Sequence, residues 1–271
     1  MNQRESFSST NKPMPDAQSS ADTRNIAINR VGIRALRHPI RVAGSAGAVQ
    51  HTVATFSLSV ALPPEVKGTH MSRFVALLET QQEAYSSKTL PAMMAKMLEM
   101  LHAQAGTIVL SFPYFIEKTA PVSGIKSLLD YDITLEADVS INGITTVRTT
   151  IVTGVTSLCP CSKEVSEYGA HNQRSHISIM AESADLIGFT DIIRMAEANA
   201  SSELYGLLKR VDEKFVTEYA YDNPKFVEDL VRDVAQALER EPRVSAYRVE
   251  CENFESIHNH TAFAVIENKK T

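Results

Sequence analysis

Apolar and polar residues alternate along several stretches of this chain, as they do in strands that bury one face. The alternation is strictest in residues 132–141, where Ile133, Leu135 and Val139 are separated by polar or acidic residues. The strands predicted from this pattern are residues 31–42, 53–62, 107–117, 132–141, 144–158, 174–181, 244–254 and 261–266.

Four other stretches carry apolar residues at the three- and four-residue spacing of a helix with one buried face. Met93 and Met97 belong to one of them. Another starts at Pro224, which suits a first helical position and follows Asn223 as a cap. The predicted helices are residues 74–85, 90–105, 191–208 and 224–240.

These elements follow one another as strand, strand, helix, helix, strand, strand, and the order occurs twice. An antiparallel sheet with helices on one face accounts for this order, because alternating strands leave one side apolar and in need of cover. The sequence therefore predicts an α+β fold.

Two features divide the chain. Asn142-Gly143 predicts a two-residue hairpin turn, and it lies at the boundary between approximate halves 25–142 and 143–271. Residues 1–24 are rich in Ser, Asn, Gln, Asp and Pro and have almost no apolar content. Such a segment cannot offset the entropy lost on ordering, so we expect a disordered tail.

Composition and charge narrow the class of protein. The chain has 271 residues, 44% of them hydrophobic, and can bury a large core. Its formal net charge of −5 argues against a general nucleic-acid binder. No run approaches the roughly 18 apolar residues that span a bilayer, and the amino terminus lacks the apolar core of a signal peptide. We expect a cytoplasmic protein with no nucleic-acid or membrane partner.

The strongest candidate for chemistry is a polar loop between two predicted strands. It contains Cys159 and His171, which pair a thiolate with an imidazole, groups that can hold a catalytic metal with one position left open. Pro160 fixes the turn before Cys161, so one metal is expected to take one sulfur rather than both. Three alternatives stay open: buried or incidental thiols, a reversible disulfide, and a merely solvated histidine.

A carboxylate would complete such a site. Glu213 lies between two helical runs, where it could turn inward. Spacing alone does not distinguish Glu213 from Asp212 or Glu218, and a solvated surface carboxylate is the alternative for each of them.

His258 and His260 form a separate candidate group. Residues two apart on an extended segment face the same side, so both imidazoles would enter one volume, as a proton relay or a metal pair requires. Glu255 is close enough to orient one of them. Two exposed histidines at a hairpin tip are the alternative.

Residues 67–73 precede a predicted helix, whose amino terminus favours phosphate through its N–H groups and dipole. The loop supplies an imidazole, a hydroxyl and a guanidinium from His70, Ser72 and Arg73. Other basic side chains are expected to join the same pocket, namely Lys67, Lys163, Arg174 and His176.

Four motifs in order resemble the type IB GTP cyclohydrolases. They are Lys-Gly-Thr-His-Met-Ser-Arg at 67–73, Ser-Leu-Cys-Pro-Cys-Ser-Lys at 157–163, Gly-Ala-His-Asn-Gln-Arg-Ser-His at 169–176 and Glu-Ser-Ile-His-Asn-His at 255–260. The resemblance runs from about residue 28 to the end. It implies the tunnelling fold with two tandem ββααββ units, and a homotetramer with active sites at subunit interfaces.

The resemblance also implies a reaction and roles for residues. The family hydrolytically opens the imidazole ring of GTP, releasing formate and giving 7,8-dihydroneopterin triphosphate, the first step of tetrahydrofolate biosynthesis. Its metal ligands would be Cys159, His171 and Glu213. The guanine ring would be anchored by Glu228, and protons would be transferred by His258 and His260.

Ligand type leaves the metal open, since a mixed sulfur, nitrogen and oxygen site can hold Zn²⁺, Mn²⁺ or Fe²⁺. Tunnelling-fold relatives with other chemistry are a nitrile reductase with a cysteine nucleophile and a pterin synthase with a three-histidine zinc site, and neither uses this set of motifs. A rival of another class binds metal or purine nucleotides without turnover, with Cys159 and Cys161 as a redox-sensitive clasp.

Overall fold

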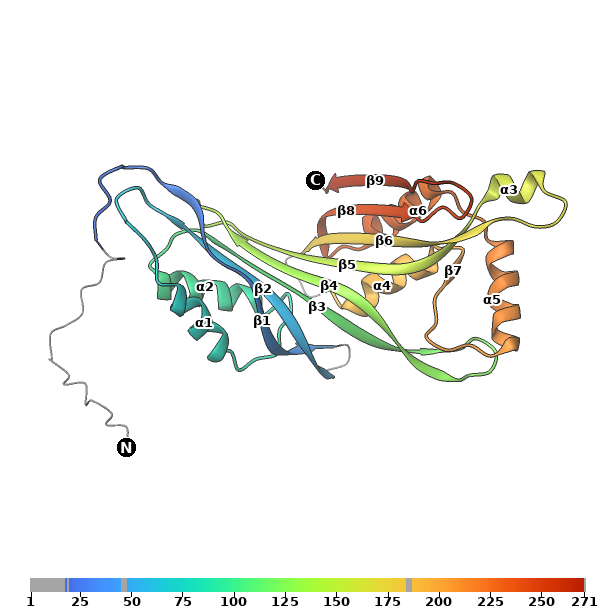
Figure 1. Ribbon diagram of the computed structural model, residues 1–271, viewed down its shortest axis with the longest axis horizontal. Coiled ribbons are helices and arrows are strands. Elements are labelled where there is room, and N and C mark those ends of the chain that lie inside the picture. Colours follow the sequence, from blue (N-terminus) through green and yellow to red (C-terminus); the bar gives the residue numbers. More distant parts are fainter. Residues whose placement is uncertain (1–17, 19, 45–47, 184–186, 271) are drawn as a thin grey trace, which may run out of the picture.

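The computed structural model describes residues 18, 20–44, 48–183 and 187–270. Nine strands of these residues form one antiparallel sheet in the order β1-β2-β3-β4-β5-β6-β8-β9, with β7 paired to β5 (Figure 1). The strands are β1 (Ile28–Ala43), β2 (Val49–Leu62), β3 (Gly106–Thr119), β4 (Lys126–Val139), β5 (Thr145–Leu158), β6 (Asn172–Ser183), β7 (Ser202–Glu203), β8 (Val244–Asn253) and β9 (Ala262–Lys269).

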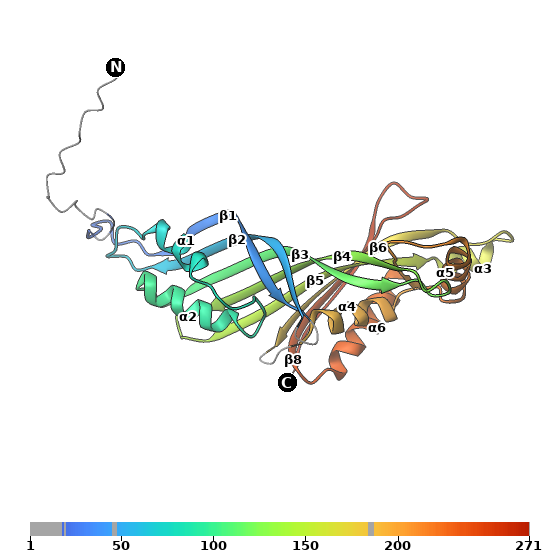
Figure 2. The ribbon, with the colours of Figure 1, turned by 90° about the horizontal axis from the view of Figure 1, so that it is seen from below.

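Helices cover one face of this sheet (Figure 2). Over the first strands lie α1 (Met71–Glu79) and α2 (Leu90–Leu101), and over the last strands lie α4 (Phe189–Ala198) and α6 (Val227–Arg240). Beyond the strand ends stand α3 (Pro160–Val165) and α5 (Arg210–Asp222). The predicted α+β class, an antiparallel sheet with helices on one face, is confirmed.

The alternation of apolar residues produces the core, because strand register aligns the buried positions. Ile133, Ile151 and Ile179 lie opposite one another on β4, β5 and β6, and each is at most 1% exposed. Phe56 and Leu110 are paired in the same way on β2 and β3. The intervening positions on these strands, which point to the other face, are mostly polar or charged.

Three predicted helices end earlier than their apolar spacing indicates, and one of them is the helix predicted over residues 90–105, which is α2 and stops at Leu101. The helix predicted over residues 74–85 is α1, which stops at Glu79, because Tyr85 returns to the sheet and its N–H donates to the Arg41 carbonyl at 2.7 Å. The helix predicted over residues 191–208 is α4, which stops at Ala198. Residues 202–203 instead pair with β5 as β7.

Other elements differ from the sequence prediction. Only Asp212 and Ala220 of α5 are buried, and the apolar side chains of Val211, Phe215 and Tyr219 on this helix stay exposed. The six residues of α3 bury none of their side chains. The turn between β4 and β5 contains three residues rather than two: Ser140 pairs with Ile144, and Gly143 takes a φ of 75°.

The sheet divides near its middle. β4 stays paired with β5 only from Asp132 to Val139, whereas β3 and β4 remain paired as far as Thr119 and Lys126. Beyond this point β7 occupies the place beside β5 that β4 has left. The β3–β4 hairpin therefore projects away from β5, as Figure 1 shows.

Most of the predicted tail, residues 1–17 and 19, lies outside the described residues. Ala21 forms an isolated bridge with Val66, and the Asp22 N–H donates to the Glu65 carbonyl at 2.9 Å. Backbone pairing thus starts a few residues before the predicted boundary at residue 24. No helix among the described residues is long and apolar enough to cross a membrane.

Candidate active site

β5 and β6 bring Cys159 and His171 together. Leu158 and Asn172 are the last residues paired between these strands, and beyond them the Cys159 N–H donates to the His171 carbonyl at 3.1 Å. Residues opposite each other on neighbouring strands have Cβ atoms about 4.5–5.5 Å apart. Strand register therefore places the predicted thiol and imidazole side by side.

Hydrogen bonds orient the His171 imidazole. Its Nδ1 lies 2.9 Å from Oε1 of Gln173, an atom that only accepts, so Nδ1 is assigned the proton. Nε2 is then left with the lone pair that a metal ligand needs. Ser162 fixes the backbone nearby, because its Oγ accepts from the His171 N–H at 3.1 Å and donates to the Cys159 carbonyl at 3.2 Å.

The cysteines differ in their surroundings. Cys159 is partly buried just before α3, Cys161 is exposed, and all three cysteines are free thiols. Burial raises the pKa of the Cys251 thiol to about 12, so this residue stays protonated and packs in the core. Of the three, Cys159 is the one whose backbone N–H is hydrogen-bonded to a histidine, His171.

The loop between β8 and β9 brings His258 and His260 to the same end of the sheet. Their rings stack with centroids 5.2 Å apart, and Glu255 Oε2 lies 3.2 Å from His258 Nδ1. Ser256 Oγ in this loop is 3.5 Å from His171 Nδ1. The structure thus places two exposed imidazoles in one volume, in a loop whose Ser256 reaches His171.

Among the three carboxylates left open by sequence, Glu213 is the one available to a ligand. Both oxygens of Asp212 are occupied by hydrogen bonds, and Glu218 is paired with Lys214 at 2.7 Å. Glu213 is exposed in the first turn of α5. The described residues contain no group of three His, Cys, Asp or Glu placed to hold a metal, so Glu213 is not grouped with Cys159 and His171.

Asp212 fixes the start of α5, the helix that carries Glu213. Its carboxylate accepts from the N–H groups of Val122, Ser123 and Lys209 and from the Ser123 hydroxyl, at 2.6–2.9 Å. Burial raises the pKa of this carboxyl, but these hydrogen bonds outweigh the burial and hold the pKa well below its ordinary value. Sequence spacing could not show that Asp212 turns inward and Glu213 outward.

We expect the stability supplied by Asp212 to disappear in acid. A depressed folded-state pKa contributes stability above the unfolded value of 3.8, and the contribution is lost as pH falls below it toward the folded value. The difference in Tm between wild type and Asp212→Asn should therefore shrink between about pH 5 and about pH 2.5. Glu218→Gln, an exposed substitution on the same helix, serves as the control. A constant Tm difference across this range would contradict the assignment.

Glu228 begins α6 at the same end of the molecule. The Lys225 N–H donates to the Leu158 carbonyl at 3.0 Å, which ties the start of α6 to the end of β5. Glu228 follows in the first turn, with its side chain exposed. The carboxylate predicted to anchor guanine is thus held near the strand end that leads into Cys159.

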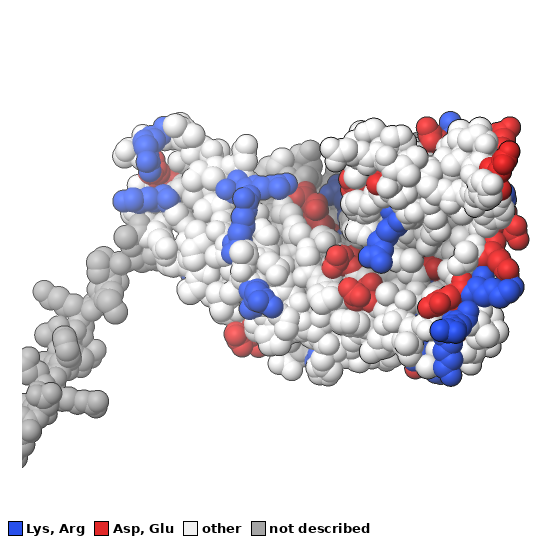
Figure 3. Space-filling view, turned by 45° about the vertical axis from the view of Figure 1, so that its right-hand side comes forward, with Lys and Arg blue, Asp and Glu red and all other residues white. Residues whose placement is uncertain are grey.

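The predicted phosphate residues of the second half lie at this end but on different surfaces. Lys163 donates to the Tyr221 carbonyl and stands 4.3 Å from that ring, so α5 and α3 are in contact. Arg174 and His176 are exposed on the sheet face away from the helices, with His176 4.8 Å from Phe254. Figure 3 shows acidic and basic side chains intermixed at this end rather than one broad basic field.

The predicted single basic pocket is not formed within one chain. His70, Ser72 and Arg73 adjoin or start α1 at the opposite end of the sheet, as both ribbon views show. β5 starts near that end with Thr145, and Cys159 follows its other end. The 14 residues of β5, each with a rise of about 3.3 Å, therefore separate α1 from Cys159. Arg73 also supports the fold, because its Nη1 donates to the Met100 carbonyl at 2.8 Å and joins α1 to α2.

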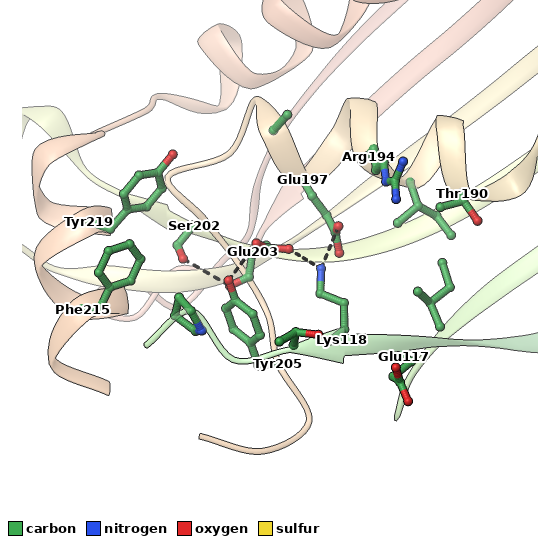
Figure 4. Close-up of a pocket in the computed structure, with 15 residues that line it drawn as sticks. Glu117, Lys118, Thr190, Arg194, Glu197, Ser202, Glu203, Tyr205, Phe215 and Tyr219 are labelled. Atoms are coloured by element: carbon green, nitrogen blue, oxygen red, sulfur yellow. Dashed lines mark hydrogen bonds and ion pairs between the residues drawn. The ribbon is translucent and has the colours of Figure 1, made fainter. Parts of the chain in front are cut away.

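The structure also shows a cavity that sequence reasoning missed, at the point where the β3–β4 hairpin leaves β5. Lys118 lies inside it with Glu197 and Glu203 (Figure 4). A signal was present, since Lys118 follows Phe112, Tyr114 and Ile116 at the alternate positions of β3 that face the core. A lysine at a core-facing position of a strand is buried, and a buried charge needs a partner of opposite charge.

Comparisons with known structures identify the fold. The chain has the fold of the urate oxidases: it matches uricase from Arthrobacter globiformis with a TM-score of 0.52 at 9% identity, covering 90% of this chain and 94% of the other. Urate oxidase from Bacillus sp. TB-90 matches with a TM-score of 0.50 at 8% identity, covering 90% and 100%.

Sequence comparison then gives the family. The chain belongs to the family described as Type I GTP cyclohydrolase folE2, whose model matches residues 14–264. Proteins named GTP cyclohydrolase FolE2 from Burkholderia thailandensis and Thiobacillus denitrificans are 60% and 57% identical over 257 residues, in each case covering 95% of both chains. The resemblance read from the four motifs is confirmed at the level of this family.

Proposed function

We propose that this chain is a GTP cyclohydrolase, which opens the imidazole ring of GTP, releases formate and forms 7,8-dihydroneopterin triphosphate. Membership of the FolE2 family supports the reaction. The structural observation that carries the proposal is the pairing of Cys159 with His171 beside the loop of His258 and His260. Water attack on a purine carbon needs an activated nucleophile and positioned proton donors, and these groups supply both requirements.

The donor set fits a divalent metal. Cys159 offers sulfur and His171 a free Nε2, and the hydrogen bond to Gln173 fixes the tautomer, as the outer partners of metal-bound histidines do. We assign the third ligand to Glu213, whose exposed carboxylate requires a movement of α5 or a neighbouring subunit to reach the pair. When bound, Zn²⁺, Mn²⁺ or Fe²⁺ would lower the pKa of a water toward neutrality.

The protein side chains then bind and protonate the substrate. Glu228 can accept hydrogen bonds from N1–H and the exocyclic amine of guanine, an arrangement that adenine cannot satisfy. His258 and His260 can donate protons to the opening ring nitrogen and to the sugar, because imidazoles exchange protons near neutral pH. Glu255, 3.2 Å from His258, orients that ring.

We further propose two tandem ββααββ units in the tunnelling fold, with halves at 25–142 and 143–271, assembled as a homotetramer. The first unit would be β1, β2, α1, α2, β3 and β4, and the second β5, β6, α4, α6, β8 and β9. Such a homotetramer would account for the distance of His70, Ser72 and Arg73 from Cys159 within one chain. A neighbouring subunit would bring them to the triphosphate, together with Lys163, Arg174 and His176.

The test is an assay for products. Protein reconstituted with Mn²⁺, Zn²⁺ or Fe²⁺ is incubated with GTP, and formate and a fluorescent pterin are measured after oxidation. We expect both products in equal amounts. Nucleotide binding without product for any of the three metals would instead favour the binding-only rival.

We expect Gln173 to control metal affinity. Loss of an outer hydrogen-bond partner of a metal-bound histidine typically weakens binding by about 10–100-fold, so Gln173→Ala should raise the Kd for Mn²⁺ by that factor. Excess metal should restore its pterin production. Gln173→Glu keeps an acceptor for Nδ1–H and should bind Mn²⁺ far better than Gln173→Ala. Equal affinity in wild type and Gln173→Ala would remove His171 from the metal site.

A further inference from the structure

A cavity of about 660 Å³ lies apart from the candidate active site. It opens where the β3–β4 hairpin parts from β5 and is lined by β3, α4, β7 and α5. None of the residues proposed for catalysis, metal binding or GTP binding lines it. A volume of this size suits a small organic ligand, for which cavities of roughly 300–1,000 Å³ are usual.

One wall of the cavity is aromatic. Phe215 and Tyr219, one turn apart on α5, stack with ring centroids 5.8 Å apart and planes 13° apart. They remain 42% and 47% exposed, so their surfaces are not covered by the core. Ile116 and Ile193 provide apolar surface elsewhere in the cavity. Such a lining favours a planar aromatic ligand.

The floor of the cavity has an excess of negative charge. Lys118 contributes one positive charge and lies against two carboxylates, Glu197 and Glu203. Glu197 is 9% exposed, with one oxygen bonded to Lys118 and the other to the Tyr131 hydroxyl at 2.6 Å. Glu203 is 36% exposed, and its two oxygens accept from Lys118 and from the Tyr205 hydroxyl, the latter at 2.7 Å. Each carboxylate oxygen has a second lone pair that can accept from a further donor. The floor therefore favours a ligand that presents an amine-type N–H.

The lining also includes a cation. Arg194 is exposed on α4, one turn before Glu197, and makes no ion pair with any described residue. Figure 4 shows its guanidinium on the α4 side of the cavity, beyond Glu197 as seen from Lys118. An anionic group on the ligand would be stabilised there by charge-assisted hydrogen bonds.

We propose that this cavity is a second, non-catalytic site for a bicyclic heteroaromatic ring with an exocyclic amine and a phosphorylated side chain. The ring lies against Phe215 and Tyr219, the amine donates to Glu203, and the phosphate contacts Arg194. The choice of a 2-amino purine or pterin rests on the proposed function, because the substrate and the product of that reaction share this chemistry. Their binding here would make the site a sensor of one of the two.

The test is calorimetric titration of the full-length protein with guanosine monophosphate and, separately, 7,8-dihydroneopterin monophosphate. We expect two classes of site per chain for at least one probe. Phe215→Ala and Arg194→Ala should each weaken one class by at least about tenfold, the effect of losing a strong contact. Glu228→Ala should remove the other class. Inosine monophosphate, which has no exocyclic amine, should not fill the cavity site.

Matched variants separate the roles. Arg210→Ala on α5 and Phe263→Ala on β9 remove exposed side chains that do not line the cavity, so both should bind like wild type. Arg194→Ala should leave the affinity for unphosphorylated guanosine unchanged. The probe that binds tightly identifies the site as one for substrate or for product.

Two outcomes would overturn the inference. One is a single class of site in the wild type that Glu228→Ala abolishes, and the other is binding indifferent to both Phe215→Ala and Arg194→Ala. Failure of the proposed function is distinguishable, since it shows as absent pterin production from GTP whatever the number of binding sites.

Discussion

Cys159→Ala should abolish the production of formate and pterin from GTP while leaving the protein folded. Alanine removes the sulfur donor beside His171, and even the loss of a group that only supports a metal ligand costs about 10–100-fold, so the loss here should exceed about 100-fold. The fold should survive, because the hydrogen bond from residue 159 to the His171 carbonyl uses the backbone N–H. Activity is measured with saturating Mn²⁺, and folding by circular dichroism and Tm.

Cys161→Ala is the matched control, since this thiol is exposed two residues further on. We expect it to retain activity under reducing conditions, because one metal takes one sulfur here. Wild-type activity in Cys159→Ala would remove that thiol from the metal site. Loss of activity in Cys161→Ala alone would make Cys161, rather than Cys159, the sulfur donor.

Lys118→Met should cause the largest loss of stability expected from removing a single charge. Lys118 and Glu197 are each 9% exposed in their side chains, and Lys118 also contacts Glu203. Removing one partner of a buried ion pair leaves uncompensated charge and typically costs about 3–5 kcal/mol. The quantity to measure is the free energy of unfolding in urea at neutral pH.

Two further variants test the origin of that loss. Lys126→Met breaks an ion pair with Glu117 on the same hairpin, but these side chains are 63% and 56% exposed, so the cost should stay below about 1 kcal/mol. Combining Lys118→Met with Glu197→Gln and Glu203→Gln should recover part of the stability, because the stranded charges are removed as well. A loss in Lys118→Met no larger than in Lys126→Met would contradict the buried network.

The sheet was predictable because its strands alternate so regularly. Ile133 and Ile151 lie opposite each other on β4 and β5, as the two-residue alternation of apolar positions indicates. The hairpin between these strands follows from Asn142 and Gly143. α5 was not predicted, although Val211, Phe215 and Tyr219 recur at helical spacing, because charged residues dominate its first turns. The end of α4 also escaped, because Leu204 and Leu207 continue a helical spacing while the backbone of residues 202–203 pairs with β5.

The candidate site was predictable where local sequence places its residues together. Cys159 and His171 flank one connection between neighbouring strands, and His258 and His260 are two residues apart, so short-range geometry suffices for each pair. The position of Glu213 depends on how α5 docks at the end of the sheet, which no local pattern encodes. Separation of Arg73 from Lys163 depends on the whole length of the sheet.

The division of the sheet creates an inner edge on the β4 side of β5 and another on β4 itself, each with ladder groups that have lost their neighbour. Unpaired edges of this kind recruit strands from other molecules and promote aggregation. Here the two residues of β7 cap one edge, while Lys118 and its carboxylates place buried charge beside the other. A variant without β7 or the buried charges would be expected to self-associate through these strand edges before it unfolds.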